Sequence, residues 1–211
     1  MSDVMVQGDF WQIAPDADEP QRRSIREVLA DGITADDIKA LLRLRHEQPR
    51  KDWSAWAFFD EFIPGTGTAP SASSRIDGWA INVWPSGGFI TIAYEIKVNR
   101  GDFLRELRDP RKRNWALEFS DEFYFVAPYG LIDRAELPAE CGLVEVSKVG
   151  VRGMYRLGEQ RYNLRVKVKP APRQKRPAPS WALLASVARR ACRAENAAVK
   201  DPDGLGGEVT A

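Results

Sequence analysis

The chain has 211 residues, of which 44% are hydrophobic and 29% are charged, and its formal net charge is +1. This length, with seven Trp and nine Phe, excludes a disordered chain and predicts one globular domain of ordinary size with polar extensions. The sequence has neither an apolar run of roughly 18 residues nor a signal-peptide core. We therefore expect a cytoplasmic protein without a membrane partner.

The two ends of the sequence carry opposite charge. Residues 1–21 contain five acidic residues and no Lys or Arg, whereas residues 161–193 contain ten Lys or Arg and no acidic residue. This asymmetry is compatible with a polyanionic partner or with solvated tails. We divide the chain into an acidic, partly disordered segment (1–33), a domain (34–169), and a basic extension (170–211) made of a Pro-rich linker, a helix and a tail.

Histidine and cysteine are scarce. His46 is the sole histidine, and Cys141 and Cys192 are isolated in the sequence. This argues against a thiolate–imidazole zinc site and leaves His46 as the one imidazole available to a catalytic triad. Because His46 ends the helical run DDIKALLRLRH, a histidine in the last turn of a helix is the favoured interpretation.

Two helices are predicted before the first glycine-rich loop. Thr34 and Asp37 form a capping-box pattern that begins a helix over residues 34–46. The segment KDWSAWAFFDEF (51–62) is predicted as a second helix, and residues 64–74 as a loop.

Residues 75–84 and 89–98 are predicted to form a β-hairpin around the turn PSGG. A three-residue bulged loop with Gly87 in the left-handed conformation makes paired residue numbers sum to 172, which places Asp77 opposite Glu95. Glu95 and Lys97 share a face by the two-residue strand period. A loop one residue longer would put Asp77 on the other face.

The remaining pattern alternates between helices and strands. Asn99 caps a helix, Asp109-Pro110 opens another, residues 122–128 and 141–146 are strands, and residues 154–169 form a final hairpin. Residues 50–150 thus follow the order α-β-β-α-β-β. The fold class predicted is α/β (α+β), with a central mixed β-sheet flanked by helices.

The hairpin offers a candidate metal site. Two carboxylates on one face, Asp77 and Glu95, repel each other unless a proton or a cation lies between them. Oxygen ligands favour Mg²⁺ or Mn²⁺, and the main-chain carbonyl of Ile96 is a further candidate ligand. Lys97 would then assist the attacking water. The alternative is an exposed cross-strand charge cluster that contributes a few tenths of a kcal/mol, roughly, to stability.

The helices after the hairpin are rich in basic residues, either as a phosphate-attracting rim of the site or as a salt-bridged helix face with Asp102, Glu106 and Asp109. These basic residues are Arg100, Arg105, Arg108, Arg111, Lys112 and Arg113.

The pattern D77-(x17)-E95-I96-K97, on a hairpin followed by a helix, resembles the PD-(D/E)XK nuclease fold. The longer stretch that begins YEIKVNRGDFLREL and ends GLVEV resembles MmcB-like DNA-repair proteins and related phage proteins, from about Trp53 to Val146. The resemblance implies a restriction-endonuclease-like core. It departs from the family at Ile76, where Pro is usual, and in the long Gly/Ser/Pro stretch before it.

The resemblance implies roles for particular residues. Asp77 and Glu95 would bind the metal and Lys97 would complete the catalytic triad. The helix before the hairpin would add an acidic residue, Glu61 first and Asp60 second. The residues expected to contact DNA are Arg75, Arg100, Lys112 and Arg113.

Three functions follow as hypotheses. The first is Mg²⁺- or Mn²⁺-dependent hydrolysis of DNA phosphodiesters, by a nuclease of DNA repair or phage DNA processing. The second is a catalytically silent DNA-binding module of the same fold, since the superfamily includes inactive members. The third is an interaction protein whose charged hairpin is structural. The sequence leaves the oligomeric state open, a homodimer included.

Overall fold

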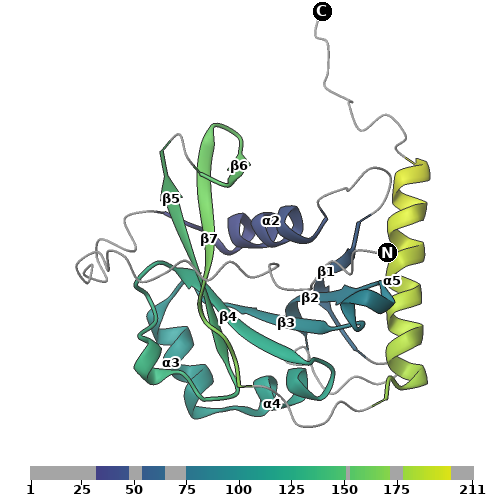
Figure 1. Cartoon of the computed structure of the whole chain (residues 1–211), viewed down its shortest axis with the longest axis horizontal. Helices are drawn as coiled ribbons and strands as arrows, with labels where there is room; N and C mark the ends of the chain where they lie inside the picture. The colour runs from purple at the N-terminus through teal and green to yellow at the C-terminus, as the bar shows by residue number, and fades with distance from the viewer. Residues whose placement is uncertain (1–31, 48–53, 65–74, 151–152, 172–177, 201–211) are drawn as a thin grey trace, which may run out of the picture.

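The computed structural model describes residues 32–47, 54–64, 75–150, 153–171 and 178–200, without the side chains of 194–200. Its centre is a seven-stranded mixed sheet in the order β1-β2-β3-β4-β5-β7-β6 (Figure 1). The pairs β3–β4 and β4–β5 are parallel, and the other pairs are antiparallel. The strands are β1 (Trp56–Phe62), β2 (Ile76–Asn82), β3 (Thr91–Ile96), β4 (Glu122–Pro128), β5 (Gly142–Val149), β6 (Tyr155–Leu157) and β7 (Gln160–Val168).

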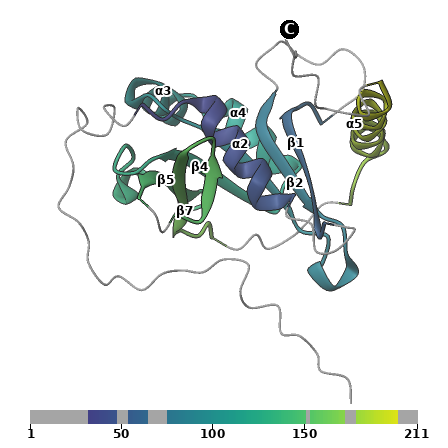
Figure 2. The same ribbon diagram turned by 90° about the horizontal axis from the view of Figure 1, so that it is seen from above.

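Helices flank this sheet, so the predicted mixed α/β class is confirmed. Helix α2 covers one face, and α5 runs along the β1 side of the molecule (Figures 1 and 2). The helices are α2 (Ala35–His46), α3 (Arg100–Arg108), α4 (Arg111–Glu118) and α5 (Trp181–Lys200), with short 3-10 turns at Pro85–Gly87 and Arg134–Glu136. Within the described residues, no helix is long and apolar enough to cross a membrane.

Two core clusters fill the two sheet faces. On the α2 face, Leu41 and Leu42 pack with Tyr94. On the opposite face, Phe103 of α3 and Ala116 of α4 pack with strand residues and with α5. We call these the α2 face and the α3/α4 face. Because strand residues alternate between them, every side chain of β3 can be assigned to one face by its position.

The predicted helix over residues 51–62 is wrong. Residues 56–62 form strand β1, paired antiparallel with β2, whereas residues 51–53 lie outside the described residues. Phe58 is buried in the α2-face cluster and Phe59 in the α3/α4-face cluster. A strand buried on both faces is apolar at consecutive positions, and this hides the alternation that identifies a strand.

The hairpin register is confirmed, although its turn differs from the prediction. Trp79 pairs with Ala93, and these numbers sum to 172. Pro85–Gly87 form a 3-10 turn, and Gly88, not Gly87, is left-handed, with φ 63°. Gly87 is required for a different reason, because a Cβ there would lie 2.0 Å from Oδ1 of Asn82.

Most predicted helix ends are confirmed. Thr34 and Asp37 form the capping box of α2, and Asn99 caps α3 through the Gly101 amide. Helix α4 begins one residue later than predicted, with Pro110 at the cap. The C-terminal helix is present as α5. The N-terminal segment to residue 31, most of the Pro-rich linker and the tail from residue 201 lie outside the described residues.

Candidate active site

Asp77 and Glu95 lie on the α3/α4 face of neighbouring strands. The register that pairs Gly78 with Tyr94 continues by one residue to oppose Asp77 and Glu95. The Ile96 amide donates a hydrogen bond of 2.9 Å to Asp77 Oδ2, which fixes that carboxylate over β3. Ile96, predicted as a ligand through its carbonyl, thus contacts the site through its N–H.

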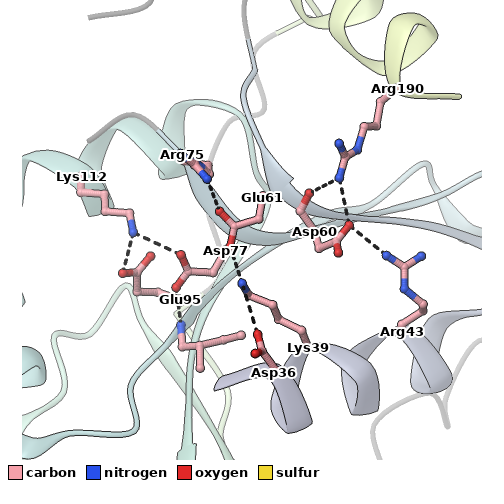
Figure 3. A network of polar contacts seen from close by, with 11 residues as sticks. Asp36, Lys39, Arg43, Asp60, Glu61, Arg75, Asp77, Glu95, Lys112 and Arg190 are labelled. Atoms are coloured by element: carbon pink, nitrogen blue, oxygen red, sulfur yellow. Dashed lines mark hydrogen bonds and ion pairs between the residues drawn. The ribbon is translucent and has the colours of Figure 1, made fainter. Parts of the chain in front are cut away.

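Lys112 lies between the two carboxylates. Its Nζ is 2.8 Å from Glu95 Oε1 and 3.4 Å from Asp77 Oδ1 (Figure 3). The ammonium comes from the first turn of α4, directly after the Asp109-Pro110 bend. In this structure a lysine of the chain itself offsets the repulsion between the two carboxylates.

Lys97 extends the charged cluster toward α3. Its Nζ lies 2.7 Å from Glu95 Oε1 and 3.7 Å from Glu106 Oε2. The side chain of Glu106 is only 9% exposed, and its Oε1 is buried without a hydrogen-bond partner. Carboxylates and ammonium groups therefore alternate along the cluster, in the order Asp77, Lys112, Glu95, Lys97 and Glu106.

Glu106 is the residue of this cluster that the sequence analysis treated only as part of a helix surface. It follows Phe103 by three positions in α3, and Phe103 is fully buried against the sheet. Residues at i and i+3 share a helix face, so this spacing pointed Glu106 toward the site.

Glu95 is the electrostatic centre of the cluster, and its side chain is 4% exposed. Burial raises its pKa, as does the neighbouring charge of Asp77, while Lys97 and Lys112 oppose the rise. For Lys112, burial lowers the pKa, but attraction to Glu95 and Asp77 outweighs this effect and raises it. The surroundings therefore favour a protonated Lys112 and make the charge on Glu95 costly.

Glu61 lies on strand β1 and not on the expected helix. Its backbone is left-handed, with φ 50°, and its carboxylate is paired with Lys39 of α2 and with Arg75 at 2.7 Å. Burial raises the pKa of Glu61, but the hydrogen bonds from Lys39 and Arg75 lower it overall. Figure 3 shows these pairs beside Asp77. The second choice, Asp60, is bonded by Arg43 of α2 and Arg190 of α5.

Two of the arginines predicted to contact DNA instead contact residues of the protein itself. Arg100 pairs with Glu136 and lies over the Phe103 ring, 5.4 Å from its centroid. Arg113 is 6% exposed and lies 3.4 Å from Glu140. Arg113 is therefore buried and does not lie on the solvent-facing rim on which it was expected. Lys112 is the predicted DNA-contacting residue that reaches the carboxylate pair.

Asp77 and Glu95 are the two carboxylates that could hold a cation at this site. Among the described residues, no group of three or more His, Cys, Asp or Glu side chains is placed to hold a metal ion. Mg²⁺ commonly uses one or two carboxylates and completes its shell with water and substrate phosphate, so Asp77 and Glu95 fit this ion. The ammonium of Lys112 already occupies a cation position between them.

Comparisons with known proteins leave the family open. No protein-family model matches the chain, and no curated protein matches it. A solved structure of a protein of unknown function from Silicibacter pomeroyi is similar over 72% of this chain and 85% of its own, with a TM-score of 0.46 and 21% identity. A similarity at this level carries no argument about function.

Proposed function

We propose that this domain hydrolyses phosphodiester bonds of DNA with the help of Mg²⁺ or Mn²⁺. The observation that supports it is the convergence of Asp77 and Glu95 on one cation position, with Lys97 in direct contact with Glu95. When bound, the metal would neutralise charge on the phosphate and lower the pKa of water. The pattern of these three residues is also the one that resembles PD-(D/E)XK nucleases.

In this proposal the residues of the chain have separate roles. Asp77, held by the Ile96 amide, and Glu95 hold the cation. Lys97 keeps a positive charge next to Glu95, where it stabilises the charge that develops on the phosphoryl group. Lys112 leaves the carboxylates when the metal enters, and its ammonium then pairs with a phosphate oxygen of the substrate.

The contact of Lys112 with both carboxylates also favours a second candidate, a DNA-binding module that does not cut. In that case the lysine is a permanent substitute for the metal, and the five alternating charges are a structural network. The two candidates differ in one measurable property, which is whether a divalent cation displaces Lys112 from Asp77 and Glu95.

The decisive experiment measures Mn²⁺ binding by calorimetry and cleavage of single-stranded, duplex and branched DNA with Mg²⁺ or Mn²⁺. Wild type should bind the ion and cut, whereas Asp77→Asn and Glu95→Gln should lose both, with cutting reduced by about 100-fold or more. Lys97→Met should bind the ion but fail to cut. Lys112→Met should bind Mn²⁺ more tightly, because the competing ammonium is gone.

Glu122→Gln is the matched control, because Glu122 is a partly buried carboxylate that bonds Tyr124, a residue of the α2-face core. It should leave ion binding and cutting unchanged. A wild-type protein that binds DNA but neither binds Mn²⁺ nor cuts would favour the silent module. Binding of neither DNA nor metal would leave the structural interpretation of the hairpin.

A further inference from the structure

Strand β7 carries basic residues at alternate positions. Tyr162, Leu164 and Val166 are buried in the α2-face core cluster. Since neighbouring residues of a strand point to opposite faces, the residues between them point away from α2. These residues are Arg161, Asn163 and Arg165, whereas a β-bulge opposite Leu143 and Val144 interrupts the alternation at Lys167.

Strand pairing places these residues on the same sheet face as the carboxylate pair. Glu95 pairs with Phe125 of β4, which pairs with Leu143 of β5, and both apolar residues belong to the α3/α4-face cluster. Two residues further along β5, Glu145 pairs with Arg165. Arg165 therefore shares the sheet face of Glu95, with β4 and β5 between their two strands.

Strand β6 extends the row. Arg156 pairs with Arg161, and its neighbours Tyr155 and Leu157 pack on the α2-face core. We call Arg156, Arg161 and Arg165 the β7 basic face. In Figure 1, β6 and the adjoining part of β7 form an arm that projects away from α3 and α4.

Among the described residues, the three arginines of this face are in no ion pair. Arg156 and Arg165 are exposed. Arg156 donates to the Gly158 carbonyl at 2.7 Å and Arg161 to the Gly153 carbonyl at 3.3 Å, and neither contact neutralises the guanidinium. The acidic residue opposite Arg165 is Glu145, which is 7% exposed and accepts a hydrogen bond from the Gly130 amide.

We infer that the β7 basic face binds the sugar–phosphate backbone of DNA. The identity of the ligand rests on the proposed function. Alternate positions on a strand repeat every ~6.6 Å, so the charges form an extended row that suits a linear polyanion. The outward positions of this row carry no large apolar side chain, which disfavours a folded protein or a membrane as the ligand.

The experiment measures the anisotropy of fluorescein-labelled single-stranded and duplex DNA in EDTA, over a series of salt concentrations. Arg165→Glu should weaken binding by about tenfold, and Arg161→Glu with Arg165→Glu should lower the slope of log K against log salt by about 2. Thermal unfolding of each variant, in the same buffer, checks that it folds. Arg165 is exposed, so the single variant keeps the test valid if the double variant unfolds.

Lys148→Glu is the matched control. Lys148 lies on β5, next to the arm, and pairs with Tyr162, a residue of the α2-face core. Its substitution by Glu therefore makes the same charge change on the opposite face. It should change affinity by less than twofold. Equal losses for Lys148→Glu and Arg165→Glu, or no loss for Arg165→Glu, would overturn the inference. So would binding of polyglutamate as tight as that of DNA.

The outcome is separable from that of the proposed function. If wild type binds DNA through this face but fails to cut, the cleavage proposal fails and the basic face stands. If wild type cuts DNA and Arg165→Glu binds as tightly as wild type, the basic face fails and cleavage stands.

Discussion

Two buried polar clusters lie back to back on neighbouring residues of β3. Tyr94 points to the α2 face, where its hydroxyl is 2.8 Å from His46 Nε2. Glu95 points to the α3/α4 face, where two lysines contact it. Both clusters bury titratable groups, but the first excludes charge and the second concentrates it.

The difference shows how a fold separates a structural polar contact from a candidate site. His46 is the last residue of α2 and lies among Trp56, Phe58 and Tyr94. Burial, helped by Arg45, lowers the pKa of His46 to about 3, so the ring stays neutral. The prediction that His46 lies in the last turn of a helix is confirmed. On the other face, two lysines keep Glu95 in a charged environment.

The largest effect on stability is expected in acid, when His46 of the neutral cluster is protonated. An unfolded His46 gains a proton below its ordinary pKa of 6.5, whereas the folded form resists until about pH 3. Stability should therefore fall as the pH drops through this window, by about 2 kcal/mol at pH 5 relative to pH 8. Chemical denaturation of wild type and His46→Gln at both pH values measures it.

His46→Gln should be less stable than wild type at pH 8, because it loses the stacking on Phe58. Its stability should not show the fall between pH 8 and pH 5, because it has no imidazole to protonate. Equal acid sensitivity of the two proteins would show that other groups cause it. Tyr94→Phe serves as the second variant, since it keeps the titrating ring and should retain the pH dependence.

At Glu95 we expect a smaller effect on stability, with the opposite dependence on pH. Its raised pKa means that the ionised form destabilises the folded protein, with Lys97 and Lys112 offsetting part of the cost. Below the ordinary pKa of 4.5 the group is protonated in both states, so Glu95→Gln should have no pH-dependent effect there. As the pH rises through the raised pKa, the variant should become progressively more stable than wild type.

Denaturation of Glu95→Gln at pH 4, 6 and 8 tests this sign. A variant that loses stability relative to wild type as the pH rises would show that the two lysines outweigh the burial of the carboxylate. The expected combination, a more stable protein that no longer binds Mn²⁺, is typical of a site that retains charge for function.

The sequence predicts the face of Glu95 better than it predicts the partners of Glu95. The register came from local chemistry, because the runs on both sides of PSGG alternate and one face of each is apolar. The predicted register is observed although Gly88, not Gly87, is the left-handed residue of the turn. Strand β1 was missed because Phe58 and Phe59 are both buried, one on each face.

Contacts made by α3 and α4 depend on packing that no local pattern specifies. Lys112 and Arg113 are neighbours with the same charge, yet Lys112 reaches Glu95 and Arg113 is buried beside Glu140. A rotation of α4 by about 100° would exchange them, and the sequence does not fix that rotation. Asp77, Glu95 and Lys97 were therefore predictable as a group, and the spacing from Phe103 indicated the face of Glu106, whereas the contact of Lys112 with Glu95 required the tertiary structure.

The smallest expected effect comes from Glu106, which ends the charged cluster behind Lys97. Glu106→Gln removes the more distant of the two carboxylates beside Lys97 and leaves the contact with Glu95 at 2.7 Å. We expect cleavage turnover to fall by about tenfold or less with little change in KM, because the residue positions Lys97 and does not touch DNA. The pH profile of turnover should also shift, which a packing defect alone would not cause.

Asp102→Asn is the control for this prediction, since Asp102 is on the same helix and its side chain is 52% exposed beside Arg105. It should leave turnover and its pH profile unchanged. Glu106→Asp should restore part of the activity if the negative charge is what orients Lys97. A Glu106→Gln protein with normal turnover and an unshifted profile would limit the functional cluster to Asp77, Glu95, Lys97 and Lys112, because the carboxylate of Glu106 would then have no part in holding the lysine.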